Sequence, residues 1–128
     1  MISLDKYKWL AIPVLRYGIA LVYFYFAISQ LINPELFVFY VPNFLAEIVN
    51  PVYLVYFNAV FELVFATLLA IGKFTRISAL FLTIHLFFIS LSLGFTQNGV
   101  RDFGLTIATS AIFIYGPDKL CLDNKQEN

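Results

Sequence analysis

Three stretches of this sequence are long and apolar enough to cross a lipid bilayer as helices, and they constrain the fold most strongly. They comprise residues 13–32, 52–72 and 77–95. A helix needs about 20 mostly apolar residues to span the hydrocarbon core of a bilayer. A fourth stretch, residues 100–116, is shorter and opens on the charged pair Arg101 and Asp102, but it can span if that pair lies inside a bundle. The sequence therefore predicts an all-α fold, an integral membrane four-helix bundle.

The composition supports a membrane protein and excludes several other classes. Only 12% of the 128 residues are charged, about half the share in a typical soluble domain. The formal net charge is zero, so no basic excess indicates nucleic-acid binding. The single cysteine, Cys121, cannot form a disulfide within the chain, and no residues have the spacing of a zinc site. We therefore expect the lipid bilayer as the first partner, no nucleic acid and no metal.

Turn signals along the chain indicate a single transmembrane domain over residues 1–128. Its helices are expected at about residues 10–32, 52–72, 76–96 and 99–116. Asn33-Pro34 ends the first helix, because proline disfavours the helical conformation in the residue before it. Residues 35–51 are too polar and too interrupted to span but contain apolar runs, which predicts a short interfacial segment between the first two helices. Residues 117–128 are expected to form a disordered polar tail, with Cys121 as a free surface thiol.

The distribution of Lys and Arg predicts the orientation in the membrane. Basic residues precede the first helix, lie between the second and third, and follow the fourth: Lys6, Lys8, Lys73, Arg76, Lys119 and Lys125. Residues 33–51 contain none. Because basic residues concentrate in cytoplasmic loops, we expect a multi-pass protein of the cell membrane with both termini cytoplasmic. A cleaved signal peptide is the competing interpretation of residues 1–32, but the apolar stretch is long and shows no clear small-x-small cleavage site.

Each predicted helix carries its polar and small residues at spacings of three, four or seven, which place them on one face. The four sets are Arg16, Tyr23 and Gln30; Asn58, Glu62, Ala66 and Ala70; Ser78, His85 and Ser92; and Asp102, Thr106 and Thr109. Leu, Ile and Phe cover most of the remaining surface. Within a bilayer, small residues permit close helix approach and polar residues hydrogen-bond between helices. The polar faces are therefore expected to meet inside the bundle.

Glu62 is expected to be protonated, hydrogen-bonded or salt-bridged, because an ionised carboxylate inside a bilayer is costly unless it is paired. At 1.5 Å per residue, Glu62 lies about 15 Å along the second helix and His85 about 13 Å along the third, so the two can meet near the midplane. Asn58, one turn away, can bond Glu62 directly. Arg101 and Arg16 approach from opposite sides as candidate counter-charges, and we expect Arg101 to pair with Glu62.

Two interpretations of this cluster stay open from the residues alone. Glu62 either handles a proton or binds a ligand, or it fixes helix register as a structural clasp. His85 could ligate haem or exchange a proton with a quinol. A bis-histidine haem would need its second histidine from another subunit, because this chain has a single histidine. A hydrogen-bonded core histidine is the commoner case. Arg101 and Asp102 could also be a simple pair at a helix start. The candidate cluster comprises Glu62, Asn58, His85, Arg101, Asp102 and Arg16.

Three segments carry a family resemblance: LRYGIALVYFYFAISQL at 15–31, FELVFATLLAIGKFTRISAL at 61–80 and RDFGLTIATSAIFIYGPDKLCLD at 101–123. The positions that match best are Glu62, Gly72, Thr75, Arg76, Ala79, Arg101, Asp102, Gly116, Pro117 and Asp123. Together they resemble the DoxX-like family of small four-helix integral membrane proteins. A lysine that the family carries near residue 31 is absent here, and Cys121 stands where serine is usual.

This resemblance implies a small subunit near redox chemistry, because the family is named for subunits of a terminal quinol oxidase and a thiosulfate:quinone oxidoreductase. We therefore predict an accessory subunit of a quinone-linked membrane redox complex, associated with other membrane subunits or with copies of itself. Quinone is the only cofactor implied, since the sequence shows no intrinsic metal, flavin, nicotinamide or haem site. Animal relatives act as membrane chaperones, so a non-enzymatic lipid-binding, assembly or chaperone-like module is the alternative. The sequence assigns no catalytic residue and leaves open whether the chain is an enzyme.

Overall fold

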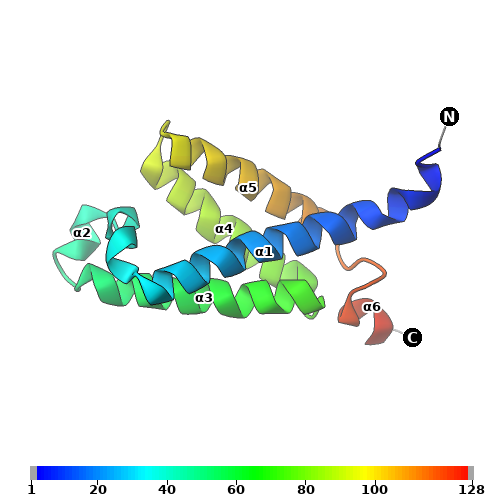
Figure 1. Ribbon diagram of the computed structural model, residues 1–128, viewed down its shortest axis with the longest axis horizontal. Helices are drawn as coiled ribbons and strands as arrows, with labels where there is room; N and C mark the ends of the chain where they lie inside the picture. The colour runs from blue at the N-terminus through cyan, green and yellow to red at the C-terminus, as the bar shows by residue number, and fades with distance from the viewer. Residues whose placement is uncertain (1–2, 127–128) are drawn as a thin grey trace.

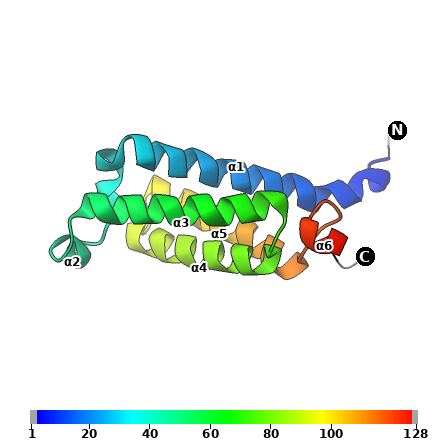
Figure 2. The same ribbon diagram turned by 90° about the horizontal axis from the view of Figure 1, so that it is seen from below.

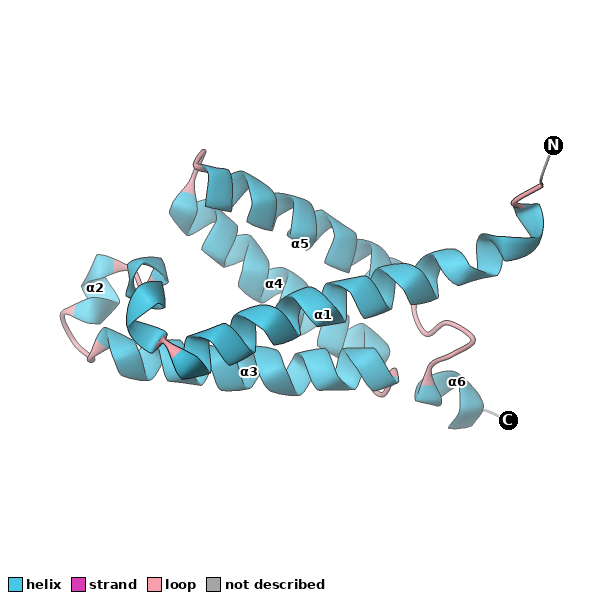
Figure 3. Ribbon diagram, in the orientation of Figure 1, coloured by secondary structure: helices cyan, strands magenta, loops and turns pink. Residues whose placement is uncertain are grey.

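The structure, a computed structural model, describes residues 3–126, and all regular secondary structure in this range is helical. Four long helices form the body: α1 (Ala11–Ile32), α3 (Pro51–Ile71), α4 (Thr75–Leu93) and α5 (Gln97–Tyr115). The shorter elements are the 3-10 helices η1 (Asp5–Leu10) and η2 (Pro34–Tyr40), with the short helices α2 (Asn43–Ala46) and α6 (Leu122–Gln126). The predicted all-α membrane bundle is confirmed (Figure 1; Figure 3).

Among the described residues, three helical segments are long and apolar enough to cross a membrane: Asp5–Ile32, Pro51–Ile71 and Thr75–Leu93. The fourth long helix, α5, has 19 residues, the same length as α4, but it is less apolar because its first turns are charged. Of its two charged residues, Asp102 is buried and Arg101 is partly exposed; they pair with each other, and Arg101 also contacts Tyr40 of η2. This placement agrees with the expectation that α5 is accommodated by the bundle rather than by lipid alone.

The four long helices pack as two antiparallel pairs. α1 packs mainly against α3, and α4 packs mainly against α5, with weaker packing between the pairs. In Figure 1 the α4–α5 pair diverges from α1 and α3 toward the end that carries η2 and α2, while the pairs converge near the two termini. Figure 2 shows α1, α3 and α4 running nearly alongside one another. The end of the bundle near the termini is therefore closed by helix packing, and we call it the closed end. The opposite end is covered by η2 and α2.

Local sequence signals determine where the helices begin and end. Asn50 caps α3, because its side chain accepts a hydrogen bond from the Val52 N–H, and Pro51 occupies the first turn, where its missing N–H costs nothing. Thr96 caps α5 by accepting from the backbone N–H three residues later. α3 ends at Gly72, whose φ of 75° is left-handed and favours glycine.

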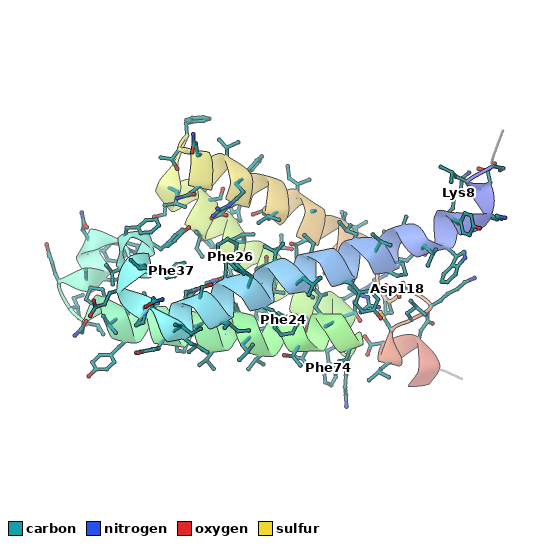
Figure 4. All side chains as sticks on the ribbon, viewed as in Figure 1. Lys8, Phe24, Phe26, Phe37, Phe74 and Asp118 are labelled. Atoms are coloured by element: carbon teal, nitrogen blue, oxygen red, sulfur yellow. The ribbon has the colours of Figure 1, made fainter. Side chains whose placement is uncertain are left out.

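Arg16 lies at the closed end, where it is fully buried and joins three segments. Its Nε donates to Asp118 Oδ2 at 2.8 Å, and its Nη1 donates to the carbonyl oxygens of Leu69, at 2.8 Å, and Ala70. Carbonyls in the last turn of a helix have no partner within the helix. Asp118 lies beside the N-terminal half of α1 (Figure 4). The prediction that Arg16 is a counter-charge for Glu62 is wrong, because Arg16 is held roughly two turns of α3 away.

The segment after α5 is docked on the bundle, which corrects the prediction of a disordered tail. Asp123 accepts hydrogen bonds from the backbone N–H groups of Phe74 at 2.9 Å and Thr75 at 2.7 Å. No side chain at the start of α4 caps it, and Phe74 is left-handed with a φ of 51°. Asp123 thus supplies the cap. Burial acts to raise the pKa of Asp123, but the N–H donors outweigh it and lower the pKa. Residues 127 and 128 of the predicted tail lie outside the described residues.

Cys121 is fully buried, so the prediction of a free surface thiol is wrong. The reason is a close approach to Gly72: a Cβ at that glycine would lie 2.5 Å from the Cys121 Cα. The Asp123 N–H also donates to the Gly72 carbonyl at 2.9 Å. The absence of a side chain at residue 72 lets the chain after α5 lie directly on the turn between α3 and α4.

Cys121 should therefore react slowly with a thiol reagent while the tail is docked. Burial raises the pKa of its thiol, which also lowers the thiolate fraction near neutral pH. Asp123→Ala should accelerate alkylation by maleimide about fivefold at pH 7.5, because removing a helix cap costs about 1 kcal/mol. Asp5→Ala, a matched change at an exposed site in η1, should leave the rate unchanged. Equal rates in the Asp123 variant and the parent protein would contradict docking through this cap.

The connection between α1 and α3 has one apolar face without protein partners. Leu36, Phe39, Phe44 and Ile48 are exposed at 68%, 57%, 67% and 78%. Other side chains of the same connection line an internal cavity. This two-sided pattern agrees with the predicted amphipathic segment, since an interfacial helix buries one face in the headgroup region.

Candidate functional site

A cavity of about 250 Å³ lies between the two helix pairs, beneath η2 and α2. Most of its wall is apolar, and Figure 4 labels Phe26 and Phe37, which line it from α1 and η2. The polar side chains in the wall are Tyr23, Gln30, Tyr40, Asn58, Glu62, His85, Arg101 and Asp102. An apolar concavity with a few convergent polar groups is the usual form of a small-ligand site.

Glu62 lies in the wall of this cavity, where its carboxylate accepts hydrogen bonds from two amides. Gln30 Nε2 donates to Oε2 and Asn58 Nδ2 donates to Oε1, each at 3.1 Å. Asn58 Nδ2 also donates to Gln30 Oε1 at 2.7 Å, so the three side chains form one network between α1 and α3. Hydrogen bonds to a charged group contribute about 1.5–3 kcal/mol each. The network therefore offsets part of the cost of burying the carboxylate.

His85 approaches Glu62 from α4. Its Nε2 lies 3.5 Å from Glu62 Oε1, close enough for an ion pair but beyond the usual length of a hydrogen bond. Nε2 is buried and has no hydrogen-bond partner among the described residues. Phe61 packs on the imidazole with 4.8 Å between ring centroids. Buried polar atoms normally have a partner, so the unpaired nitrogen leaves a position for a polar group of a ligand.

Arg101 lies at the rim of the cavity and pairs with Asp102, so the prediction that it pairs with Glu62 is wrong. Arg101 Nε and Nη2 both lie 3.2 Å from Asp102 Oδ1. Nη2 also donates to the Tyr40 hydroxyl of η2 at 3.3 Å, and the guanidinium lies 5.0 Å from the centroid of the Phe26 ring. The Arg101 side chain is 43% exposed. Pairing with the neighbouring acid leaves the guanidinium partly solvated, which costs less than moving it to the depth of Glu62.

Most of the predicted cluster thus surrounds one space. Glu62, Asn58, His85, Arg101 and Asp102 line the cavity, whereas Arg16 belongs to the closed end of the bundle. On α4 the buried serines are Ser78 and Ser90, while Ser92 is exposed. Within the described part of the chain, no group of three or more His, Cys, Asp or Glu residues is arranged to hold a metal ion.

Three polar residues of the cavity wall, Tyr23, Gln30 and Tyr40, are missing from the predicted cluster. Gln30 bonds Glu62 directly, and its place on the polar face of α1, seven residues after Tyr23, was a usable signal. Tyr40 contacts Arg101 from the connection between α1 and α3. No local pattern marks Tyr40, because its contact spans 61 residues of sequence and depends on how η2 folds over the bundle.

The cavity is built largely from a region that matches a known protein family. The model of the DoxX family matches residues 11–95, from the start of α1 to just beyond α4. The chain belongs to the DoxX family. The resemblance predicted from the sequence is thereby confirmed. Arg101, Asp102 and Asp118 follow the matched region. Comparisons with curated proteins and with solved structures returned no match.

Proposed function

We propose that this DoxX protein is an accessory subunit of a membrane redox complex and that its cavity holds the head group of a quinone. The observation that carries the proposal is the polar set of Glu62, Gln30, Asn58 and His85 inside an apolar, membrane-embedded space. A quinone needs this combination, because its ring is apolar and its oxygens form hydrogen bonds.

The size of the cavity supports a ring-sized ligand. Pockets for drug-sized ligands enclose about 300–1,000 Å³, and this cavity of about 250 Å³ is slightly smaller. It therefore suits one head group, with an apolar tail leaving between the helix pairs. Phe26 and Phe37 supply aromatic surfaces against which a flat ring can pack.

The charge distribution and the topology support a location, an orientation and a set of partners for the protein. We place the protein in the cell membrane with both termini in the cytoplasm, because Lys and Arg flank the end that carries the termini and are missing from residues 33–51. Its proposed partners are other membrane subunits, which hold the electron-carrying groups, or further copies of the chain. The domain extends over residues 1–128 in this proposal, since α5 and the docked tail complete the cavity rim and the closed end.

Filling the cavity should abolish quinone binding. Val22 lines the cavity, whereas the adjacent Leu21 is 68% exposed on the outer surface. We expect Val22→Phe to weaken binding of a short-tailed benzoquinone at least tenfold by calorimetry in detergent, and Leu21→Phe to leave it unchanged. Ile89→Phe in the cavity and Phe88→Leu on the outer surface repeat the comparison on α4. Thermal melting of each variant separates loss of binding from loss of folding.

The alternative is a non-enzymatic lipid-binding, assembly or chaperone-like module. Purification in mild detergent should recover oxidoreductase subunits with the chain if the proposal is right. A chain that elutes alone, binds no benzoquinone and retains co-purified phospholipid in the parent but not in Val22→Phe would favour the alternative.

A further inference from the structure

Glu62 and His85 form an acid–base pair between α3 and α4 in the wall of the cavity. Glu62 Oε1 lies 3.5 Å from His85 Nε2, and only 5% of Glu62 is exposed. Among the described residues, His85 is the only basic side chain within ion-pair distance of Glu62. The charge of the Glu62 carboxylate is therefore balanced only when His85 is protonated.

The other charged groups that face the cavity balance each other. Asp102 and Arg101 of α5 form an ion pair, with 3.2 Å between Oδ1 and Nη2. Within the described part of the chain, the remaining titratable groups of the wall are the hydroxyls of Tyr23 on α1 and Tyr40 on η2. Tyrosine hydroxyls are uncharged near neutral pH. The wall therefore carries a single uncompensated negative charge when Glu62 is ionised and the imidazole is neutral.

A ligand in the cavity changes how that charge is solvated. The cavity volume of about 250 Å³ is several times the roughly 30 Å³ that one water molecule occupies in the liquid, so water that enters can solvate the carboxylate. A neutral ring that fills the same space excludes this water and supplies no counter-charge. Because a buried charge without a counter-charge is strongly unfavourable, the filled cavity favours a wall of zero net charge.

We propose that binding of the ligand is coupled to uptake of a proton from solvent, which protonates His85 and makes it the ion-pair partner of Glu62. The inference rests on the proposed function, because it takes a neutral quinone ring as the ligand. The proton adds to the unprotonated nitrogen of the imidazole, so both ring nitrogens then carry N–H groups and the net charge of the wall becomes zero. The imidazole gains the proton rather than the carboxylate, because the Gln30 and Asn58 amides donate to the carboxylate and stabilise its ionised form.

The coupling is measured by calorimetry in buffers that differ in their enthalpy of ionisation. A fully substituted, short-tailed benzoquinone has no titratable group, so any proton exchanged on binding belongs to the protein. The heats of binding in phosphate and in Tris differ by the number of protons taken up multiplied by the difference in buffer enthalpy. For the whole chain in detergent, we expect uptake to rise to about one proton per ligand between about pH 6 and about pH 9, where histidine usually loses its proton. By linkage, the dissociation constant should then rise about tenfold per pH unit.

Two variants assign the proton to this pair. His85→Gln removes the group that gains the proton, and Glu62→Gln removes the charge that the proton balances. Each should bring proton uptake close to zero and reduce the pH dependence of the dissociation constant to less than about twofold per pH unit. Glu47→Gln, at an exposed site outside the cavity, should keep the uptake of the parent protein. Melting temperatures confirm folding, and either variant alone suffices if the other unfolds.

The possible outcomes separate this inference from the proposed function. Equal heats in both buffers, with binding that does not depend on pH, overturn the inference and leave quinone binding standing. Uptake that persists in both variants overturns the role given to the pair. Uptake lost in Glu62→Gln but complete in His85→Gln places the proton on the carboxyl group and overturns the protonation of His85. If the benzoquinone does not bind the parent protein, the inference and the proposed function fall together.

Discussion

Replacing Arg16 with methionine is expected to lower the free energy of unfolding by about 3–5 kcal/mol, because the change leaves a buried carboxylate without its counter-charge. The side chains of Arg16 and Asp118 are 0% and 2% exposed, and their Nε and Oδ2 atoms are 2.8 Å apart. The substitution also removes the donor to the carbonyls of Leu69 and Ala70 at the end of α3. Unfolding of the purified protein in mixed detergent micelles measures the loss.

A double variant separates charge from packing. Arg16→Met with Asp118→Leu removes both charges and should recover about half of the lost stability or more, since an apolar pair can replace a buried ion pair. Lys8→Met breaks the exposed pair with Asp5, whose side chains are 78% and 75% exposed, and should have no measurable effect. If Arg16→Met lowered the free energy of unfolding as little as Lys8→Met, the closed end of the bundle would not depend on the ion pair between Arg16 and Asp118.

Gly72→Ala should lower the free energy of unfolding by about 2–5 kcal/mol, with two physical causes. A left-handed conformation costs a residue with a Cβ about 1–2 kcal/mol, and the φ of Gly72 is 75°. The new Cβ would also lie 2.5 Å from Cys121 Cα, and overpacking of this kind costs about 1–3 kcal/mol. The tail must shift, so maleimide should reach Cys121 faster. Thermal melting and alkylation rate are the two measurements.

Gly18→Ala is the matched control for Gly72→Ala. Gly18 lies within α1 with nothing within 4 Å of the position a Cβ would take. Alanine favours a helix interior by about 1 kcal/mol over glycine, so stability should stay the same or rise slightly. A fall in melting temperature for Gly18→Ala equal to that for Gly72→Ala would mean that contact with Cys121 is not the cause.

The candidate site was predictable in part because helical periodicity carries spatial information. The proximity of Asn58, Glu62 and His85 could be predicted from their spacing and depth along α3 and α4. In the structure all three line the same cavity. The choice of ion-pair partners was not predictable. Arg16 and Arg101 each have more than one acid within reach, along the sequence or across the bundle. Small differences in distance and solvation decide which acid each arginine pairs with.

The docked tail shows a second limit of sequence reasoning. Residues 117–126 are polar enough to suggest disorder, but Asp118 and Asp123 satisfy a buried guanidinium and the uncapped start of α4. The need for these partners lies in α1 and α4, far away along the chain. A polar segment can therefore be ordered by unsatisfied groups elsewhere, and its own composition does not reveal them.

The sequence by itself determined that the chain is a helical membrane bundle, because a bilayer accepts few other spanning structures and requires long apolar stretches. It also determined which faces of the helices are polar, since that follows from helical periodicity. Only the tertiary structure decided that Arg16 pairs with Asp118, that Arg101 stays at the rim, and that η2 and α2 cover a cavity. These features depend on how separate segments meet in space, and the energy of each contact depends on distances that no local pattern encodes.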